Sequence, residues 1–393
     1  MKKPLSEKQL WTLGSLAVLS PLLRLVPGVN MTAAENAGWL CPLAALPGLL
    51  AYGALVRALL SRRRDGETLP ELIQRTLGDR LGAAVLWLCA GWFLLYGGFL
   101  LRIGAERFFT ALGTFVRWQP FAVILLAMAI PAALGGGKAL GRVSQLFLPV
   151  ITGILLLVAL CAVPEMRWGR LKCVSAADTL PILAGALPIM NVGWGTLLIL
   201  AFLAPAGTGA NLPRTVKWSL RLGITAAVLS AVALGVLGSA LTAHLSHPFF
   251  VLLRNIRLTR ALERIEALVT AVWVLPDFVM LSALLLLACS APPQLRGRRL
   301  APLLLGVGML LIAALLSPTA FGLRVWSDRI IPIGGGAVVL READCDGEVL
   351  YNEAKRLLAD QSARDRMRSN LSNMAVVDSA ERILQTIFEL SNA

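Results

Sequence analysis

Residues 267–290 have the sequence ALVTAVWVLPDFVMLSALLLLACS, an apolar stretch whose one charged residue, Asp277, lies near its centre. A helix of this length extends about 36 Å at 1.5 Å per residue, and roughly 20 apolar residues cross the hydrocarbon core of a membrane. An Asp at the middle of a membrane raises the free energy of insertion by roughly 2.5–3.5 kcal/mol. The stretch therefore predicts a membrane span in which Asp277 faces a cavity or a polar partner.

Other stretches of the chain have the same length and composition. Together with 267–290, they give nine predicted spans, at residues 10–29, 38–60, 81–101, 120–136, 145–163, 182–204, 219–243, 267–290 and 300–316. A tenth apolar piece, 330–340, would extend only about 16 Å as a helix, which is too short to cross alone. The pattern predicts an all-α polytopic membrane protein with nine full spans and a truncated tenth.

The composition divides the chain into two unlike parts. Of the 393 residues 57% are hydrophobic and 15% are charged, whereas soluble proteins have about 25% charged residues. Residues 1–340 carry 30 basic and 13 acidic side chains, and residues 341–393 carry 7 basic and 10 acidic ones. We therefore predict a transmembrane domain over 1–335 and a small, soluble helical tail over 336–393, and we exclude a disordered chain and an ordinary soluble enzyme.

The basic residues indicate the orientation of the spans. With the N-terminus in the cytoplasm, the inner segments carry 17 Lys and Arg residues and the outer segments carry 12, with a cluster at Arg62–Arg64 in the first inner loop. Cytoplasmic loops carry an excess of such residues. We predict a cytoplasmic N-terminus, and we interpret the net charge of +14 as a topology and lipid-headgroup signal rather than a sign of nucleic-acid binding.

Signatures of enzymes and metal sites are missing from the sequence. The six cysteines form no C-x-x-C spacing, and the two histidines, His244 and His247, have no companions. Gly135–Ala139 lacks the first glycine and the Ser or Thr of a phosphate-binding loop. We predict no catalytic residues, no metal and no cofactor.

Spans one and six contain helix-weakening residues in matching positions. Span one has Gly14, Ser15 and Pro21; span six has Pro188 followed by the sequence NVGWGT at 191–196. Transporters built from inverted repeats bind solutes at such interrupted helices near the middle of the membrane. The pattern favours two broken helices that bind a small solute, although the same residues also allow close helix packing alone.

These features define a predicted binding site. The candidate contacts are Gly14, Ser15, Tyr96, Asn191, Gly193, Thr196 and Asp277, with Arg24 as a possible charge partner of Asp277. The alternative for Asp277 is a structural carboxyl group. Arg102 and Glu106, four residues apart, are interpreted as a local pair. The arginine-rich segment 247–264 is interpreted as an amphipathic helix on the outer surface, which contacts either anionic lipids or a partner.

Several short motifs resemble those of a known family. They are LSEKQL at 5–10, ENAGWL at 35–40, TLPEL at 68–72 and LERIE at 262–266. In this order they are similar to the B subunits of spore nutrient germinant receptors, over about residues 5–335. The resemblance implies a ten-helix inverted-repeat fold of the amino acid/polyamine/organocation permease type, a small nutrient such as an amino acid, partner A and C subunits, and the inner spore membrane. One departure is Thr196, where the family often has an acidic residue.

The tail resembles a different family. GAVVL at 336–340, the segment from Leu350 to Asp360, and DSAERI at 378–383 are similar to the C-terminal end of the peptidoglycan glycosyltransferase that adds N-acetylglucosamine to the lipid-linked muramyl precursor. The body of that enzyme, with its catalytic residues, has no counterpart in the sequence. The simplest hypothesis is a fusion that replaced most of span ten.

The sequence thus supports one functional hypothesis and three alternatives. The first is a germinant-receptor subunit that binds a nutrient at broken helices one and six and triggers germination. The others are an amino acid permease, a membrane-tethered glycosyltransferase remnant and a nonfunctional fusion.

Overall fold

The computed structural model describes residues 5–64, 66–112, 118–171, 174–205, 212–245, 248–255 and 265–316. Within these ranges the chain is helical and contains no β-strand. The predicted tail, the apolar piece 330–340 and the arginine-rich residues 256–264 lie outside the described residues.

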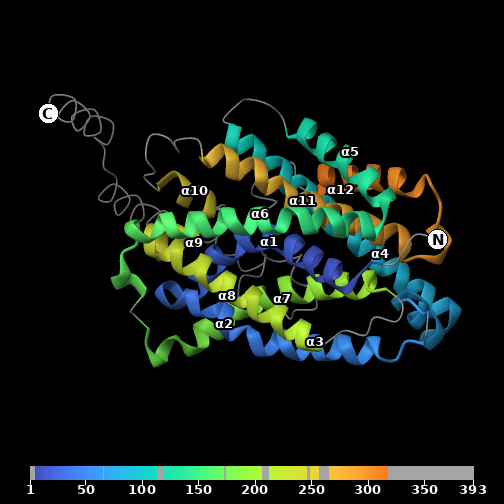
Figure 1. The fold of residues 1–393 in the computed structure, drawn as a ribbon, viewed down its shortest axis with the longest axis horizontal. Helices are drawn as coiled ribbons and strands as arrows, with labels where there is room; N and C mark the ends of the chain where they lie inside the picture. Colours follow the sequence, from blue (N-terminus) through green and yellow to red (C-terminus); the bar gives the residue numbers. More distant parts are fainter. Residues whose placement is uncertain are drawn as a thin grey trace, which may run out of the picture. The chain divides into compact units, whose positions relative to one another are not determined.

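All nine predicted spans fall on helices (Figure 1). The α-helices are α1 (Glu7–Ala34), α2 (Cys41–Ala44), α3 (Leu46–Leu60), α4 (Leu69–Leu112), α5 (Gln119–Gly135), α6 (Gly137–Ala162), α7 (Thr179–Leu203), α8 (Leu212–Leu237), α9 (Ser239–His244), α10 (Pro248–Asn255), α11 (Ile265–Ser290) and α12 (Ala301–Leu316). Short 3-10 helices occur at Glu35–Leu40 (η1), Val163–Glu165, Trp168–Leu171, Ala176–Asp178 and Pro293–Leu295.

Many of these helices have the dimensions of membrane spans. Six described segments are long and apolar enough to cross a membrane: Val26–Leu60, Leu69–Ala105, Gly137–Glu165, Ala176–Leu203, Arg214–Leu237 and Trp273–Ser290. Gln119–Gly135 and Ala301–Leu315 are shorter apolar helices. Large apolar side chains such as Leu55, Leu88 and Leu180 are exposed on the outside of the bundle, where lipid tails would surround them.

The predicted breaks in spans one and six are wrong. α1 continues from Glu7 to Ala34 through Pro21 and Pro27, and α7 continues from Thr179 to Leu203 through Pro188. The fixed φ of proline is compatible with a helix, so each proline removes one backbone donor and can kink the helix without ending it. Neighbouring helices hold such segments together in a membrane protein.

The interruptions occur instead at glycines. Gly78 within α4, Gly136 between α5 and α6, and Gly238 between α8 and α9 have φ of +78°, +77° and +88°. These left-handed conformations are easily reached by glycine, which has no Cβ. The predicted span at 219–243 is therefore two helices that meet at Gly238.

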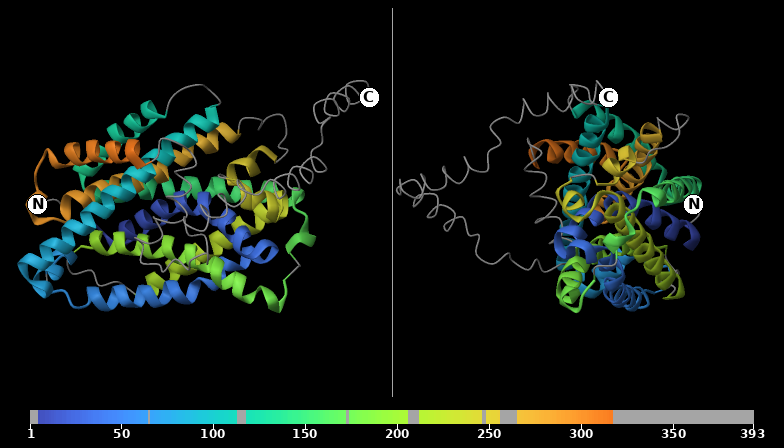
Figure 2. Two further views of the ribbon diagram at one scale, coloured as in Figure 1. Left: turned by 180° about the vertical axis from the view of Figure 1, so that it is seen from behind. Right: turned by 90° about the vertical axis from the view of Figure 1, so that its left-hand side faces the viewer.

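Most of the helices form two groups, which meet along α1. We call α1, α2, α3, α7 and α8 the α1 group, and α4, α5, α11 and α12 the α11 group, because each helix packs against others of its own group. α3 and α12 lie on opposite sides of the bundle (Figures 1 and 2). α1 also contacts α11, and α6 packs against both α1 and α11.

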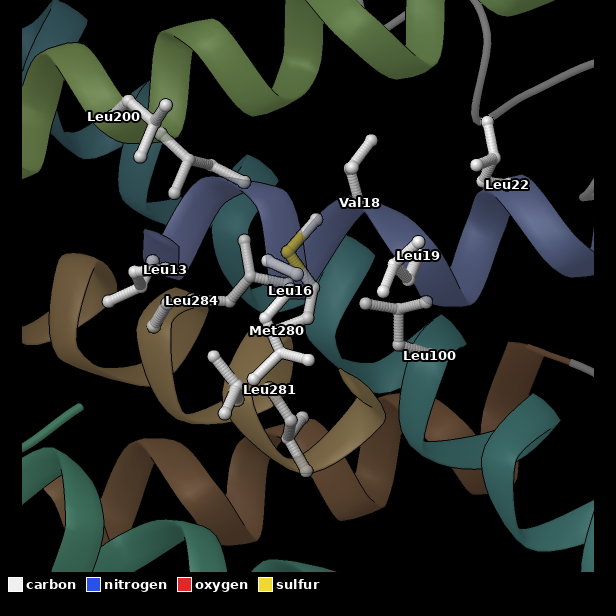
Figure 3. Close-up of a cluster of buried hydrophobic side chains, with 14 of the residues drawn as sticks. Leu13, Leu16, Val18, Leu19, Leu22, Leu100, Leu200, Met280, Leu281 and Leu284 are labelled. Atoms are coloured by element: carbon white, nitrogen blue, oxygen red, sulfur yellow. The ribbon is translucent and has the colours of Figure 1, made fainter. Parts of the chain in front are cut away.

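The interface between the groups is mainly aliphatic. Leu13 and Leu16 of α1 lie beside Leu284 and Met280 of α11 (Figure 3). Leu19 of α1 lies beside Leu100 of α4, and Leu200 of α7 approaches α1 from the other side (Figure 3). All seven side chains named are buried. α1 is thus enclosed along much of its length, so any polar residue on its inner turns needs a protein partner.

The loop before α4 is held by charged hydrogen bonds. The Glu67 carboxylate accepts hydrogen bonds from Arg75 Nε at 2.7 Å and from the Arg64 amide at 2.8 Å. Arg75 also donates to the carbonyl of Arg62 at 3.0 Å. These bonds, chiefly the one from Arg75, lower the pKa of Glu67 from 4.5 to about 2.

The depressed pKa predicts a pH-dependent loop. Because the pKa of Glu67 is lower in the folded chain than in the unfolded chain, its stabilising effect is present above pH about 4.5 and is lost as the pH falls toward about 2. Hydrogen exchange of the Arg64 amide, corrected for intrinsic rates, should show more protection in the wild type than in Glu67→Gln at pH 7. The difference should disappear toward pH 2. A constant difference across this range would contradict the assignment.

A second prediction concerns the packing of η1, the 3-10 helix that follows α1, against the last turns of α1. A Cβ atom at Gly38 would lie 2.6 Å from the backbone oxygen of Asn30, so Gly38→Ala forces backbone movement and should reduce stability by about 1–3 kcal/mol. Gly153→Ala is the control, because a Cβ there meets nothing within 4 Å. Thermal unfolding in detergent is monitored by size-exclusion chromatography. The midpoint temperature should be lower than that of the wild type for Gly38→Ala and not for Gly153→Ala. Equal midpoint temperatures for the two variants would show that Gly38 of η1 does not pack against the backbone of Asn30.

Candidate functional site

A buried polar cluster lies between the two helix groups. The Ser20 hydroxyl of α1 donates a hydrogen bond to Oδ1 of Asp277 in α11, and the exposed fractions of these residues are 1% and 4%. Arg24, one helical turn after Ser20, is 8% exposed. The carboxyl group predicted from the sequence to face a partner therefore does so, and its partner comes from span one.

Tyr96 and Phe99 of α4 complete the surroundings of these groups. Tyr96 lies close enough to Arg24 and Asp277 to interact electrostatically with both. Its ring stacks on Trp92 with the centroids 6.2 Å apart. The Arg24 Cζ atom lies 5.5 Å from the centroid of the Phe99 ring, a cation–π contact. We call Ser20, Arg24, Tyr96 and Asp277 the central polar cluster.

Helical spacing brings these side chains together. Ser20 and Arg24 are four residues apart on α1, and Tyr96 and Phe99 are three apart on α4, so each pair lies on one helical face. Asp277 belongs to Trp273–Ser290, which is 78% buried, compared with 22–56% for the other candidate spans. A charge on the most buried of these spans needs compensation from neighbouring helices, and the Ser20 hydroxyl of α1 provides a hydrogen bond to it.

Proline adjoins both members of the hydrogen-bonded pair. Pro21 follows Ser20, and Pro276 precedes Asp277. Each proline lacks the amide hydrogen that would bond to the carbonyl four residues earlier, namely Ala17 and Val272. The cluster therefore lies where two continuous helices each lack one backbone hydrogen bond.

Three other predicted contacts have structural partners elsewhere. A Cβ atom at Gly14 would lie 2.6 Å from Leu200 of α7, so this glycine allows α1 and α7 to approach closely. Ser15 donates to the carbonyl of Trp11 at 2.8 Å, and Thr196 to that of Val192 at 2.9 Å. These two hydroxyl groups are satisfied within their own helices.

The remaining two candidates lie on α7. Gly193 packs against Leu49 of α3 and Leu222 of α8, within the α1 group. Asn191 is half-buried, and its Oδ1 atom accepts no hydrogen bond from the described residues. The structure thus brings together Arg24, Tyr96 and Asp277, and it joins none of the candidates on α7 to them by a described contact.

Two buried polar residues were not proposed as contacts from the sequence: Ser20 and Arg102. Ser20 is absent from the predicted contacts, although its spacing to Arg24 places both on one face of span one. Arg102 was interpreted as a local pair with Glu106, whose side chain lies outside the described residues. Arg102 is 4% exposed, and its Cζ atom lies 4.7 Å from the centroid of the Trp118 ring.

A separate hollow opens at the end of the bundle where α1 begins. Its empty space, open solvent included, is about 430 Å³, and it is lined by Glu7, Leu10, Trp11, Gly53, Val56, Leu60, Leu197, Leu200, Ala201, Ala204 and Thr215. Glu7 forms an ion pair with Arg214 of α8, and Arg63 Nη1 donates to the carbonyl of Ala204 at 3.1 Å. The walls come from α1, α3, α7 and α8, so this hollow belongs to the α1 group alone. Across the described parts of the chain, no three His, Cys, Asp or Glu side chains gather as a metal site.

The match to a protein family covers most of this helical body. Residues 5–317 match the family described as spore germination protein. The chain belongs to this family. The match spans the predicted transmembrane domain from its first described residues to the end of α12, so the two helix groups and the central polar cluster are features of a member of the spore germination family.

Comparison with solved structures concerns the fold. The crystal structure of MhsT in complex with L-phenylalanine superposes with a TM-score of 0.64 at 13% sequence identity, covering 86% of this chain and 88% of MhsT. The chain therefore shares its fold with MhsT, and the predicted all-α class is confirmed by the described residues. No curated protein sequence matches the chain.

The hydrogen bond between the groups gives a direct prediction. Ser20→Ala removes the donor to buried Asp277 Oδ1, which should reduce stability by about 1–3 kcal/mol. Ser15→Ala is the matched control on the same helix, because the Ser15 hydroxyl bonds only to its own helix in the described structure, and its effect should stay within about 0.5 kcal/mol. Thermal unfolding midpoints in detergent compare the two variants. Indistinguishable midpoints would mean that the Ser20 hydrogen bond contributes nothing.

Proposed function

We propose that this member of the spore germination family is the membrane subunit of a nutrient germinant receptor. It binds a small nutrient, an amino acid, at the central polar cluster and triggers germination by a change in the arrangement of the two helix groups. The observation that carries the proposal is the Ser20–Asp277 hydrogen bond, which joins α1 to α11 at a buried charge. The proposed binding site is thus centred on continuous helices of both groups, not on broken spans one and six.

The location of the cluster suits a receptor. Ionisable residues inside a membrane are costly to insert and usually belong to solute or ion pathways. In transporters with inverted repeats, one helix bundle moves against the other around a site near the middle of the membrane. A ligand that exchanges contacts with Asp277 and Arg24 would interact with both groups at once, so its binding free energy would favour one arrangement over another.

The surroundings of the subunit form part of the proposal. We place it in the inner spore membrane with the N-terminus in the cytoplasm, in contact with lipids and with A and C subunits. We also propose that 1–335 forms the permease-like domain and that 336–393 is a separate soluble helical part acquired by fusion. Enzymatic activity has no support in the family or the fold, both of which are those of permeases.

An ordinary amino acid permease is the second candidate. The similarity in fold to MhsT, solved in complex with L-phenylalanine, favours this alternative. Accumulation of an amino acid in vesicles that contain this chain without other subunits would support transport, whereas nutrient-triggered germination that requires partner subunits would support the receptor.

The role of Asp277 can be tested in spores. Asp277→Asn should abolish the germination response to the nutrient while leaving the amount of protein in the membrane unchanged, because it removes a charge without changing the size of the side chain. Asp79→Asn, at an exposed position on α4, is the control and should respond like the wild type. Germination is followed by the loss of optical density, and membrane abundance by immunoblotting. A normal response of Asp277→Asn would remove Asp277 from the site.

A further inference from the structure

We propose that the first half of α8 binds an anionic phospholipid. Its phosphate contacts Lys217 and Arg221, and an acyl chain lies along Leu220, Ile224 and Val228 on the outside of the same helix. We call these five residues the α8 lipid site. This inference does not depend on the proposed nutrient site, because none of the five belongs to the central polar cluster.

Basic side chains continue from the start of α8 into its membrane-spanning part. Arg214, Lys217 and Arg221 are all exposed, and their spacing of three and four residues places them on one side of the helix. Arg221 lies about 10 Å beyond Arg214 along the helix axis. The candidate membrane span is Arg214–Leu237, so the basic side chains extend about two turns into it.

Lys217 and Arg221 lack a counter-charge within the part of the chain that the structure describes. Arg214 forms an ion pair with Glu7, whereas Lys217 and Arg221 form none. Charged side chains within a membrane span are costly unless they find a partner. Long basic side chains can extend along an apolar surface toward the lipid headgroups. The phosphate of a neighbouring lipid is therefore a suitable partner for both residues.

Exposed aliphatic side chains lie next to these cations. Leu220, Ile224 and Val228 are 39%, 55% and 46% exposed, and their spacing of four residues places them along one side of α8. They continue from the level of Arg221 further into the span. Cations at one end of a helix and aliphatic side chains beyond them match the two parts of a phospholipid, its headgroup and its acyl chain. A small soluble anion would leave the aliphatic part without a contact.

The charge of the neighbouring helix favours an anionic lipid over a zwitterionic one. α3 packs against α8, and a Cβ atom at Gly53 would lie 2.5 Å from Thr215. Arg57 follows Gly53 by one turn on the same side of α3 and is exposed. Neither α3 nor α8 contains an acidic residue. Basic sites between membrane helices bind anionic headgroups, whereas the choline group of a zwitterionic lipid would add a further positive charge.

A lipid at this site would stabilise the position of α8 beside α1. The two helices contact each other through Trp11 and Trp218, whose ring centroids are 6.0 Å apart, and through the ion pair of Glu7 with Arg214. A ligand that binds the folded chain and not the unfolded chain raises the midpoint temperature of unfolding. Anionic lipid should therefore increase the thermal stability of the protein.

Lipid titrations provide the first test. The full chain in a nonionic detergent receives phosphatidylglycerol, phosphatidylcholine with the same acyl chains, or glycerol 3-phosphate. Bound lipid is measured by native mass spectrometry and the unfolding midpoint by size-exclusion chromatography. Phosphatidylglycerol should bind at least about tenfold more tightly than phosphatidylcholine and should raise the midpoint, whereas glycerol 3-phosphate, which has no acyl chain, should not. Equal binding of the two lipids, or an equal effect of glycerol 3-phosphate, would overturn the proposal.

Charge variants locate the site. The double variant Lys217→Gln, Arg221→Gln should bind phosphatidylglycerol about tenfold more weakly or worse, since each basic residue near a membrane surface contributes to the binding of anionic lipid. The matched control is Arg298→Gln, Arg299→Gln, which removes the same charge at exposed positions before α12, a helix on the opposite side of the bundle from α3 (Figures 1 and 2). The control should bind the lipid like the wild type.

All four substitutions are at exposed positions, so both double variants should unfold at the midpoint of the wild type when no lipid is added. An unchanged affinity of the α8 variant for phosphatidylglycerol, or an equal loss in the control, would show that the lipid does not bind at Lys217 and Arg221.

A third pair of variants tests the acyl chain. Ile224→Ser removes an exposed aliphatic side chain from the α8 lipid site and should weaken the binding of phosphatidylglycerol by about threefold or more. Val307→Ser is the control, because Val307 is 47% exposed on α12 and lies outside the site. Equal affinities of the two variants would contradict an acyl chain along α8.

Discussion

The burial of one carboxyl group constrains the whole helical body. Asp277 is 4% exposed and lies within Trp273–Ser290, which is 78% buried. A carboxylate in such a place is tolerated only where hydrogen bonds and an opposite charge replace water. The Ser20 hydroxyl of α1 meets part of this need by its hydrogen bond to Asp277, and it does so only while α1 lies beside α11. The packing of α1 against α11 is therefore tied to the chemistry of one side chain.

The position of α1 follows from this requirement together with its apolar turns. Leucines on several sides of the helix contact α11, α4 and α7 (Figure 3), so no side of this part of α1 is left to lipid. Apolar contacts of this kind hold the helices together but specify their register weakly, because one leucine can replace another after a small shift. The hydrogen bond from Ser20 to Asp277 is directional. It distinguishes the observed register from neighbouring ones, which is the best-supported role of a buried polar group.

Much of the fold was predictable from the sequence because it depends on length and composition. All nine predicted spans fall on helices of the described residues, and Asp277 was identified because a charge in an apolar stretch is conspicuous. The helix breaks were not predictable. Pro21 and Pro188 suggested interruptions, yet proline is compatible with a packed helix, whereas Gly78 and Gly238 break the backbone through positive φ values that only the tertiary structure imposes. Ser20 was overlooked for a similar reason. Most helical hydroxyl groups bond to their own backbone, as Ser15 and Thr196 do, and only packing decides which one turns to another helix.

The continuity of α1 and α7 changes where movement can occur. If these helices were broken, their halves could hinge within the α1 group and leave the other helices in place. Because the helices are continuous, the change of arrangement proposed above would instead occur at their contacts with the α11 group. The described contacts there include the edge-to-face packing of Phe93 on Phe202, with centroids 5.4 Å apart, and the cation–π contact of Arg24 with Phe99. Both tolerate small sliding motions, since the interaction changes gradually with distance. The Ser20–Asp277 hydrogen bond does not, because its strength falls steeply once the geometry is lost. The Ser20–Asp277 hydrogen bond is thus the contact of this interface best suited to distinguish two discrete arrangements.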